Sequence, residues 1–177
     1  GGRQTALAVD AATPVASYRE DLLERAGVGV PQTWDDLLAL ARRGMVAFPG
    51  IPIDSLMNFY MMCSSQGEDP CRQDDIVVSR DMGIRALEQL RELASLCTKE
   101  MFDWNPIRVY EAMAARDDIA YCPFAYGYSN YARPGYAAHV LRFTDLVSIG
   151  SHGRLRTPLG GTGLAISAGT AHLDIAL

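Results

Sequence analysis

Apolar positions along this chain alternate between the short period of β-strands and the longer period of helices. Residues 5–9 and 15–16 form two short apolar runs separated by a polar turn at Asp10, which predicts strand, turn, strand. From Tyr18 the apolar residues recur at helical spacing, and Gly27 is placed to end that helix in a left-handed conformation. The first part of the chain therefore predicts two strands and a short helix.

Four later segments repeat apolar residues every three to four positions, as helices with one buried face do. Each segment begins with a signal for a helix start: Thr33, Asp54, Asp81, and Asn105 followed by Pro106. We expect the helix that begins at Asp81 to be the longest. Trp34 and Trp104 stand beside two of these starts, and we expect both to be packing residues.

Short apolar runs predict further strands at 45–48, 119–122, 146–149 and 159–166, and a final helix at 170–177. The strand that begins at Ile119 is expected to break at Pro123. Strands that alternate with helices are typical of an α/β domain, here with a small mixed sheet flanked by helices. Because the sequence has no internal repeat, we expect residues 1–177 to form a single α/β unit.

The segment from Ile119 to Tyr131 leads into a turn rich in tyrosine and has the composition of a binding surface. Tyr126 and Tyr128 offer flat apolar rings, and Asn130 can both donate and accept hydrogen bonds. Such a surface suits a ligand with hydroxyl groups around an apolar ring, and a sugar is such a ligand. Composition alone favours the alternative that these rings belong to the core.

Composition and charge exclude several classes of function. The 177 residues are 49% apolar and 21% charged, which is enough for one sizeable core. The formal charge of -5 gives no basic surface of the kind that nucleic acid requires. No apolar run is long enough to cross a bilayer. Since the chain opens on Gly1-Gly2-Arg3 without a leader and ends at Leu177 inside an expected helix, we expect a piece of a longer protein.

Several candidate chemistries lack support. The four cysteines are spaced too irregularly for a zinc site, so neither a metal nor a cofactor is expected. Cys63 and Cys71 can pair in an oxidising compartment, and free buried cysteines are an equal alternative. The glycines at 160, 161 and 163 lack the lysine and spacing of a phosphate loop, and we expect a bend or a close approach there.

Two aspartates stand where a carboxylate can face a ligand. Asp10 follows the first strand, and Asp54 precedes a helix. An aspartate in a turn more often bonds its own backbone, so the turn role is the prediction for Asp10. Asp54 can cap its helix and, at the edge of a cleft, also reach a ligand.

Four motifs follow one another along the chain: a tyrosine-led helix ending in Ala26-Gly27, the start Pro31-Gln-Thr-Trp-Asp35 of the next helix, the run Ile119–Tyr126, and the stretch Gly160–Ser167. Their order resembles the extracellular solute-binding proteins of ABC importers, in particular the sugar-binding branch that includes maltose-binding protein. The first two motifs are the most specific. The resemblance covers nearly the whole chain.

The resemblance implies a type II periplasmic-binding-protein fold, in which two α/β lobes joined by crossing strands hold the ligand between them. This chain would be the second lobe, entered by a crossing strand near 5–16 and left by another near 158–167. The full protein would be periplasmic or extracellular and would deliver a small molecule, a sugar, to an ABC permease in the membrane. It would not be an enzyme.

The resemblance also implies nine ligand-binding candidates, which are Asp10, Asp54, Phe124, Tyr126, Tyr128, Asn130, Gly160, Gly161 and Thr162. Aromatic rings would stack, polar side chains would orient hydroxyl groups, and the glycines would let backbone amides approach. Phe124 and Tyr126 fall where the family often has stacking rings, whereas the tryptophan common in that turn is absent. An isolated lobe holds half of a cleft and is expected to bind weakly.

Two alternatives remain open at this point. The same fold can bind a polyamine, a peptide or an anion instead of a sugar. An enzyme could use Asp10 or Asp54 as a general acid or base, but it would need a second catalytic group, and none stands at a telling spacing.

Overall fold

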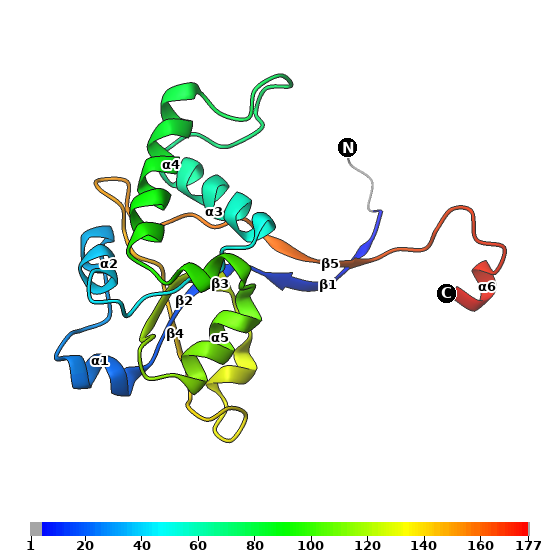
Figure 1. Ribbon diagram of the computed structural model, residues 1–177. Coiled ribbons are helices and arrows are strands. Elements are labelled where there is room, and N and C mark those ends of the chain that lie inside the picture. Colours follow the sequence, from blue (N-terminus) through cyan, green and yellow to red (C-terminus); the bar gives the residue numbers. More distant parts are fainter. Residues whose placement is uncertain (1–4, 177) are drawn as a thin grey trace.

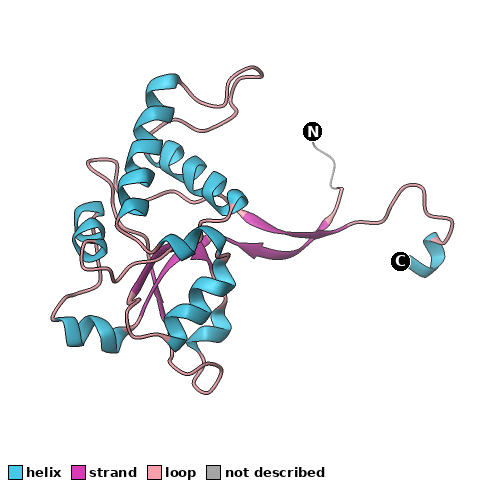
Figure 2. Ribbon diagram, viewed as in Figure 1, coloured by secondary structure: helices cyan, strands magenta, loops and turns pink. Residues whose placement is uncertain are grey.

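A three-stranded antiparallel sheet lies at the centre of the main body of the molecule (Figure 2). The computed structural model of the protein describes residues 5–176. Strand β2 (Pro14–Tyr18) lies between β3 (Tyr121–Tyr126) and β4 (Arg142–Thr144). More than 100 residues separate β2 from β3 along the chain. The sheet therefore joins the beginning of the chain to its last third.

A second, two-stranded ribbon leaves the main body and projects away from it (Figure 1). It pairs β1 (Leu7–Ala12) with β5 (Gly160–Leu164) in antiparallel register, with Asp10 opposite Thr162. The ribbon is exposed along nearly its whole length. Beyond it the chain ends in the short helix α6 (Leu173–Ala176), and residue 177 of the expected last helix lies outside the described residues.

Helices surround the central sheet (Figure 2), and their bounds are α1 Glu20–Ala26, α2 Trp34–Ala41, α3 Pro52–Ser65, α4 Arg80–Ser95 and α5 Pro106–Ala115. Two 3₁₀ turns lie at Lys99–Asp103 and Ser129–Ala132. Two of the expected caps are present here: Gly27 adopts a left-handed φ of 68°, and Thr33 forms a capping box with Asp36. Helix α4 is the longest, as its long apolar period predicts.

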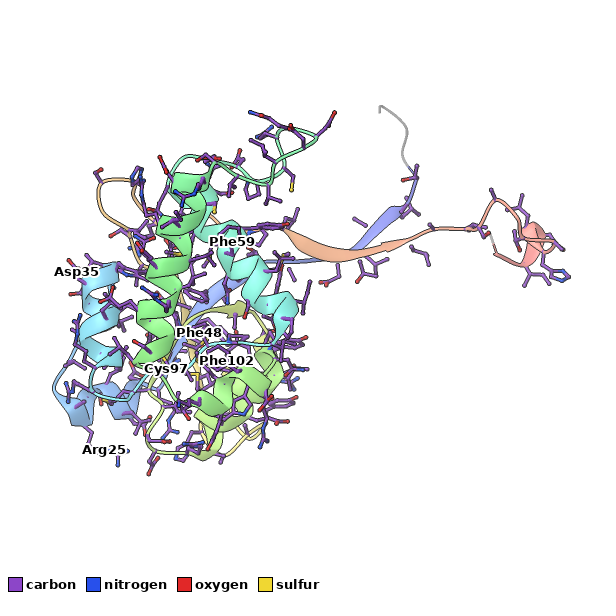
Figure 3. The ribbon with its side chains drawn as sticks, turned by 45° about the horizontal axis from the view of Figure 1, so that its top comes forward. Arg25, Asp35, Phe48, Phe59, Cys97 and Phe102 are labelled. Atoms are coloured by element: carbon purple, nitrogen blue, oxygen red, sulfur yellow. The ribbon has the colours of Figure 1, made fainter. Side chains whose placement is uncertain are left out.

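The core lies between the sheet and the helices, and aromatic side chains contribute much of it. Trp34 and Trp104 are both buried, which confirms their expected packing role. Phe124 is completely buried, and its ring centroid lies 5.3 Å from that of Phe48. Figure 3 shows Phe48 and Phe102 near the end of α4. Phe124 therefore stabilises the core, and the expectation that it stacks on a ligand is corrected.

Several expected elements differ in the structure. Strand β3 continues through Pro123 instead of breaking there, because the register shifts opposite this residue and its missing N–H breaks no ladder bond. The expected strands at 45–48 and 146–149 are reduced to isolated bridges at Val46 and Ser148. Strand β4 lies in a segment without a strand signal, where pairing to β2 determines the conformation.

Arg19 joins the first helix to the end of α5 through a buried guanidinium group. Its side chain is fully buried and forms a bidentate pair with Asp21, at 2.7 Å for both bonds. The same group donates to the carbonyl oxygens of Met113 at 2.8 Å and Arg116 at 3.1 Å. All of this charge is thus compensated inside the fold.

We expect Arg19→Met to lower the free energy of unfolding by about 2–4 kcal/mol, because two main-chain carbonyls lose their donor in a buried position. Urea denaturation of both proteins measures the difference. Arg25→Met is the control, since this arginine is 61% exposed and its ion pairs with Asp21 and Asp117 are long, at 3.8 and 3.9 Å, and we expect a change below about 0.5 kcal/mol. Equal losses in both variants would contradict the prediction.

Candidate functional site

An open cavity of about 780 Å³ lies where the projecting ribbon meets the main body. Three further elements line it, namely the N-terminus of α3, the start of α5 and the segment that follows β3. The lining residues are Asp10, Ala11, Ala12, Thr13, Ile51, Ile53, Asp54, Asn105, Pro106, Tyr126, Gly127, Tyr128, Ser129, Asn130, Gly160 and Gly161. A cavity of this size accommodates a small organic ligand.

Asp54 occupies the first turn of α3 but is not the cap that its position suggests. The helix begins at Pro52 with Ile51 as N-cap, and the cap makes no side-chain hydrogen bond. Proline at the first position needs no hydrogen-bond partner for its nitrogen, so the start of the helix is stable without a capping side chain. The carboxylate of Asp54 is thereby left free for another role.

The carboxylate of Asp54 is buried without a partner. Its residue is 8% exposed, and Oδ2 has no hydrogen-bond partner among residues 5–176. Burial raises the pKa of this carboxyl group above its ordinary value. Unpaired buried carboxylates are rare in folded proteins, and here the group lines an open cavity.

Close backbone packing determines where α3 begins. The amide of Gly50 donates to the carbonyl oxygens of Met101 and Trp104, both at 3.1 Å. A Cβ atom on Gly50 would stand 2.7 Å from the Met101 oxygen, so a side chain cannot be accommodated. The hydroxyl group of Ser55 donates to the Gly50 carbonyl at 2.9 Å. These contacts hold the first turn of α3, and Asp54 with it, at the edge of the cavity.

Two tyrosines form the aromatic part of the cavity wall. Tyr126 is half-buried, and both its burial and the charge of Asp54 raise the pKa of its phenol group. Tyr128 is 42% exposed, and its ring meets the buried Tyr110 edge-on with centroids 6.3 Å apart. The hydroxyl group of Tyr110 donates to the carbonyls of Ala125 and Tyr126 at 3.2 Å. Tyr110 thus fixes the end of β3 from which both rings project.

The ribbon supplies the opposite side of the cavity. Asp10 lies inside β1 at a register irregularity, so the expected turn at this residue is wrong and its side chain is exposed. Gly161 has a φ of 152°, and a Cβ there would overlap the carbonyl oxygen of Asp10. A Cβ on Gly160 would stand 2.9 Å from the ring of Tyr126. The predicted close approach at these glycines is therefore present, between strands and between the ribbon and the tyrosine.

The structure brings seven of the nine candidates to one cavity: Asp10, Asp54, Tyr126, Tyr128, Asn130, Gly160 and Gly161. Phe124 lies in the core, and Thr162 pairs with Asp10 one residue beyond the lining of the cavity. Sequence reasoning missed Asn105 and Ser129 as lining residues. Asn105 was recognisable as a helix cap, and its side chain does accept a hydrogen bond from the Arg108 amide at 2.9 Å.

The cavity is acidic, since its lining within residues 5–176 contains two aspartates and no lysine, arginine or histidine. Within residues 5–176 no group of three or more potential metal ligands is present. In the same part of the chain, no helix has the length and apolar character to span a membrane. The arrangement offers carboxylate acceptors, an amide and two rings, which are groups that hold an organic ligand by hydrogen bonds and ring contact.

The cysteines are all free in the structure, with Cys63 buried and Cys71 exposed, so the alternative of free cysteines holds here. Burial raises the pKa of the Cys63 thiol to about 11 and that of Cys97 to about 12. Both thiols are therefore protonated and unreactive at neutral pH.

We expect Asp54→Asn to raise the free energy of unfolding at pH 7 by roughly 1 kcal/mol, because the variant removes an unpaired buried charge. The pKa of Asp54 is higher in the folded than in the unfolded state, so its ionisation opposes folding only above the unfolded pKa. The gain should shrink as the pH falls from about 7 to about 4 and vanish where the group is protonated in both states. Urea denaturation at several pH values measures this.

Asp35→Asn is the matched control for Asp54→Asn. Asp35 also lies in the first turn of a helix, α2, but is exposed and stands apart from α3 (Figure 3). Its removal loses a favourable interaction with the helix dipole, so we expect a loss of about 0.3–1 kcal/mol at pH 7. A loss of stability in Asp54→Asn at pH 7 would refute the interpretation of its carboxylate as unpaired.

Comparison with known proteins connects this geometry to a fold. No protein-family model matches the chain, and no curated protein does. Among solved structures, the maltose-bound MalE3 of T. maritima has a TM-score of 0.82 at 18% identity, covering 99% of this chain and 49% of its own. The chain thus spans about half the length of the structures that it matches.

Two further solved structures have the same relation to the chain. An ABC transporter solute-binding protein from Thermotoga lettingae, bound with α-D-tagatose, has a TM-score of 0.76 at 18% identity over 98% of this chain and 48% of its own. An ABC transporter solute-binding protein from Agrobacterium radiobacter K84, in complex with ribitol, has a TM-score of 0.78 at 18% identity over 99% of this chain and 47% of its own. The predicted fold class is confirmed: the chain has the type II periplasmic-binding-protein fold, over about half the length of ABC-transporter sugar-binding proteins.

Proposed function

We propose that this chain is one lobe of a solute-binding protein, which captures a carbohydrate in a cleft between two lobes and delivers it to an ABC permease. The observation that carries the proposal is the open cavity at the base of the ribbon, where Asp54 presents an unpartnered carboxylate beside Tyr126 and Tyr128. Similarity to structures that hold maltose, tagatose and ribitol supports this ligand class.

The exposed apolar side chains of the ribbon support the proposal that a second lobe packs against it. Leu7, Val9 and Leu164 are between 62% and 66% exposed, so the ribbon carries an apolar surface that nothing in residues 5–176 covers. Burying each such side chain would stabilise the protein by about 1.5–3 kcal/mol. A second lobe seated on the ribbon would supply that burial and would close the cavity from its open side.

The lining groups match the two kinds of surface that a sugar presents. Its C–H faces would lie on the rings of Tyr126 and Tyr128, whose polar ends remain free to form hydrogen bonds. Its hydroxyl groups would donate to the carboxylates of Asp10 and Asp54, and Asn130 would donate or accept. The backbone of Gly160 and Gly161 can approach closely because neither residue has a side chain.

The mechanism that we propose is closure of two lobes about the ribbon, without covalent chemistry. Strands β1 and β5 would be the crossing strands, and small changes in their backbone angles would move one lobe against the other. Ligand contacts made by both lobes would stabilise the closed state. The whole protein would act outside the cytoplasmic membrane and meet its permease there.

The second candidate function is enzymatic catalysis, and the site provides few groups that could carry it out. Asp54 has the raised pKa of a general acid, but the other carboxylate of the cavity, Asp10, is exposed on a ribbon strand. Among the described residues, the cavity lining contains no histidine, cysteine or lysine that could act as the catalytic partner. Binding without chemistry accounts for the same groups.

The proposal is tested by isothermal titration calorimetry of the full-length protein with a panel of mono- and disaccharides and sugar alcohols. At least one member should bind with a dissociation constant in the micromolar range or below, which corresponds to about -8 kcal/mol. The isolated lobe should bind the same sugar more weakly by a large factor, because it holds half of the contacts. If no member of the panel gives more heat than its dilution into buffer, the proposed ligand class is wrong.

A substitution in the ring wall gives a second test. Tyr126→Ala should weaken binding of the best sugar by about tenfold or more, since one stacked ring contributes roughly 1.5 kcal/mol or more. Tyr136→Ala is the matched control, because this tyrosine is 53% exposed and does not line the cavity. We expect the control to bind normally in calorimetry, and similar losses in both variants would argue against the cavity as the site.

A further inference from the structure

We infer that the ligand is a positively charged sugar or polyol, whose ammonium group pairs with the carboxylate of Asp54. The inference rests on the proposed function and deepens it by naming the class of sugar. It depends on two separate observations, the charge of the lining that this chain supplies and the unsatisfied state of one buried carboxylate.

The first observation is that the cavity lining carries negative charge alone. Asp10 and Asp54 are its two carboxylates, and no cationic side chain stands among the lining residues in the described part of the chain. An anionic sugar, such as a uronic acid or a sugar phosphate, would meet repulsion from both without an arginine or lysine to hold it. The side of the cavity that this chain supplies therefore disfavours anions and favours neutral or cationic ligand groups.

The second observation is that Asp54 lacks the arginine partner that three other carboxylates of this protein have. Asp21 and Asp117 pair with the buried Arg19, and Asp118 pairs with Arg116. Asp54 is more deeply buried than these three, yet no ion pair or hydrogen bond satisfies its Oδ2. A buried carboxylate without a counter-charge opposes folding, and a cationic group that enters the cavity lined by Asp54 would compensate it.

An ammonium group satisfies this carboxylate better than a hydroxyl group does. It offers up to three donors and a full positive charge, and the protein interior strengthens the attraction relative to water. Tyr126 and Tyr128 line the same cavity, and aromatic faces attract cations while also fitting the C–H face of a sugar ring. One ligand that combines an amine with a polyol ring would use all of these groups together.

A neutral sugar bound to a protonated Asp54 is the competing arrangement, and pH separates the two. The titratable groups close to Asp54 are Cys122 and Tyr126 on β3, with Asp10 and Tyr128 elsewhere in the lining. Burial raises the pKa of Cys122 and that of Tyr126, so both are neutral below pH 8, and the charge of Asp54 separates the two arrangements between pH 4 and pH 8. Binding of an ammonium should weaken as the pH falls through this range, whereas binding to protonated Asp54 should strengthen.

The experiment compares matched sugars on the full-length protein by isothermal titration calorimetry at pH 7 and low salt. The probes are glucose, glucosamine and N-acetylglucosamine, with the corresponding galactose set and ribitol paired with its 1-amino-1-deoxy analogue. We expect an amine to bind at least tenfold more tightly than its hydroxyl counterpart and acetylation to remove that gain. Affinity for the amine should fall at pH 4.5.

Asp54→Asn should abolish the preference for the amine over its hydroxyl counterpart, so that the paired sugars bind the variant with affinities within about threefold of each other. Asp35→Asn, which changes an exposed first-turn aspartate of another helix, should keep the preference (Figure 3). Thermal unfolding of both variants verifies that they are folded. An amine preference that survives in Asp54→Asn would overturn the assignment to this carboxylate.

The outcomes also separate this inference from the proposed function. Neutral sugars that bind as tightly as their amines would overturn the inference and leave carbohydrate capture standing. Binding that strengthens toward pH 4.5 would overturn it in favour of a protonated Asp54. If no sugar, neutral or aminated, binds, both the proposed function and the inference fail.

Discussion

The pairing of β1 with β5 is the constraint on which the site depends. It brings Asp10 opposite Thr162, across more than 150 residues of chain, and it places both strands at the rim of one cavity. The pairing requires glycine at residue 161, where the backbone of β5 approaches the Asp10 carbonyl too closely for any side chain. At the base of the ribbon, the hydroxyl groups of Thr13 and Thr157 form a hydrogen bond that keeps the two chain segments together as they enter the body.

Arg19 and Asp54 are the charged residues that are buried within residues 5–176, and the fold treats their charges in opposite ways. Arg19 is satisfied on all sides by carboxylates and carbonyls, and it connects α1 to the end of α5. Asp54 lies at the edge of a cavity without a partner, although burial opposes its ionisation. A group that reduces stability and faces a cavity is typical of a binding site, where ligand affinity is gained at the expense of the stability of the free protein.

The tyrosines divide between structure and binding according to their place on β3 and the turn beyond it. Tyr121 and Tyr131 are buried, whereas Tyr126 and Tyr128 keep part of their rings toward the cavity. Tyr110 supports the end of the strand from α5 through hydrogen bonds to its last two carbonyls. The rigid core thus ends where the candidate binding surface begins, which holds the exposed rings in position before a ligand arrives.

The sequence by itself determined the main helices, several of their caps and the α/β class, because periodicity, Thr33, Gly27 and Pro106 act within a few residues of chain. It also pointed to seven residues of the cavity lining, among them two tyrosines, two aspartates and two glycines. Only the tertiary structure decided that Phe124 is core, that Asp10 lies within a strand, and that β4 exists. Each of these depends on strand partners distant along the chain, and local sequence carries no information about which partner a strand finds.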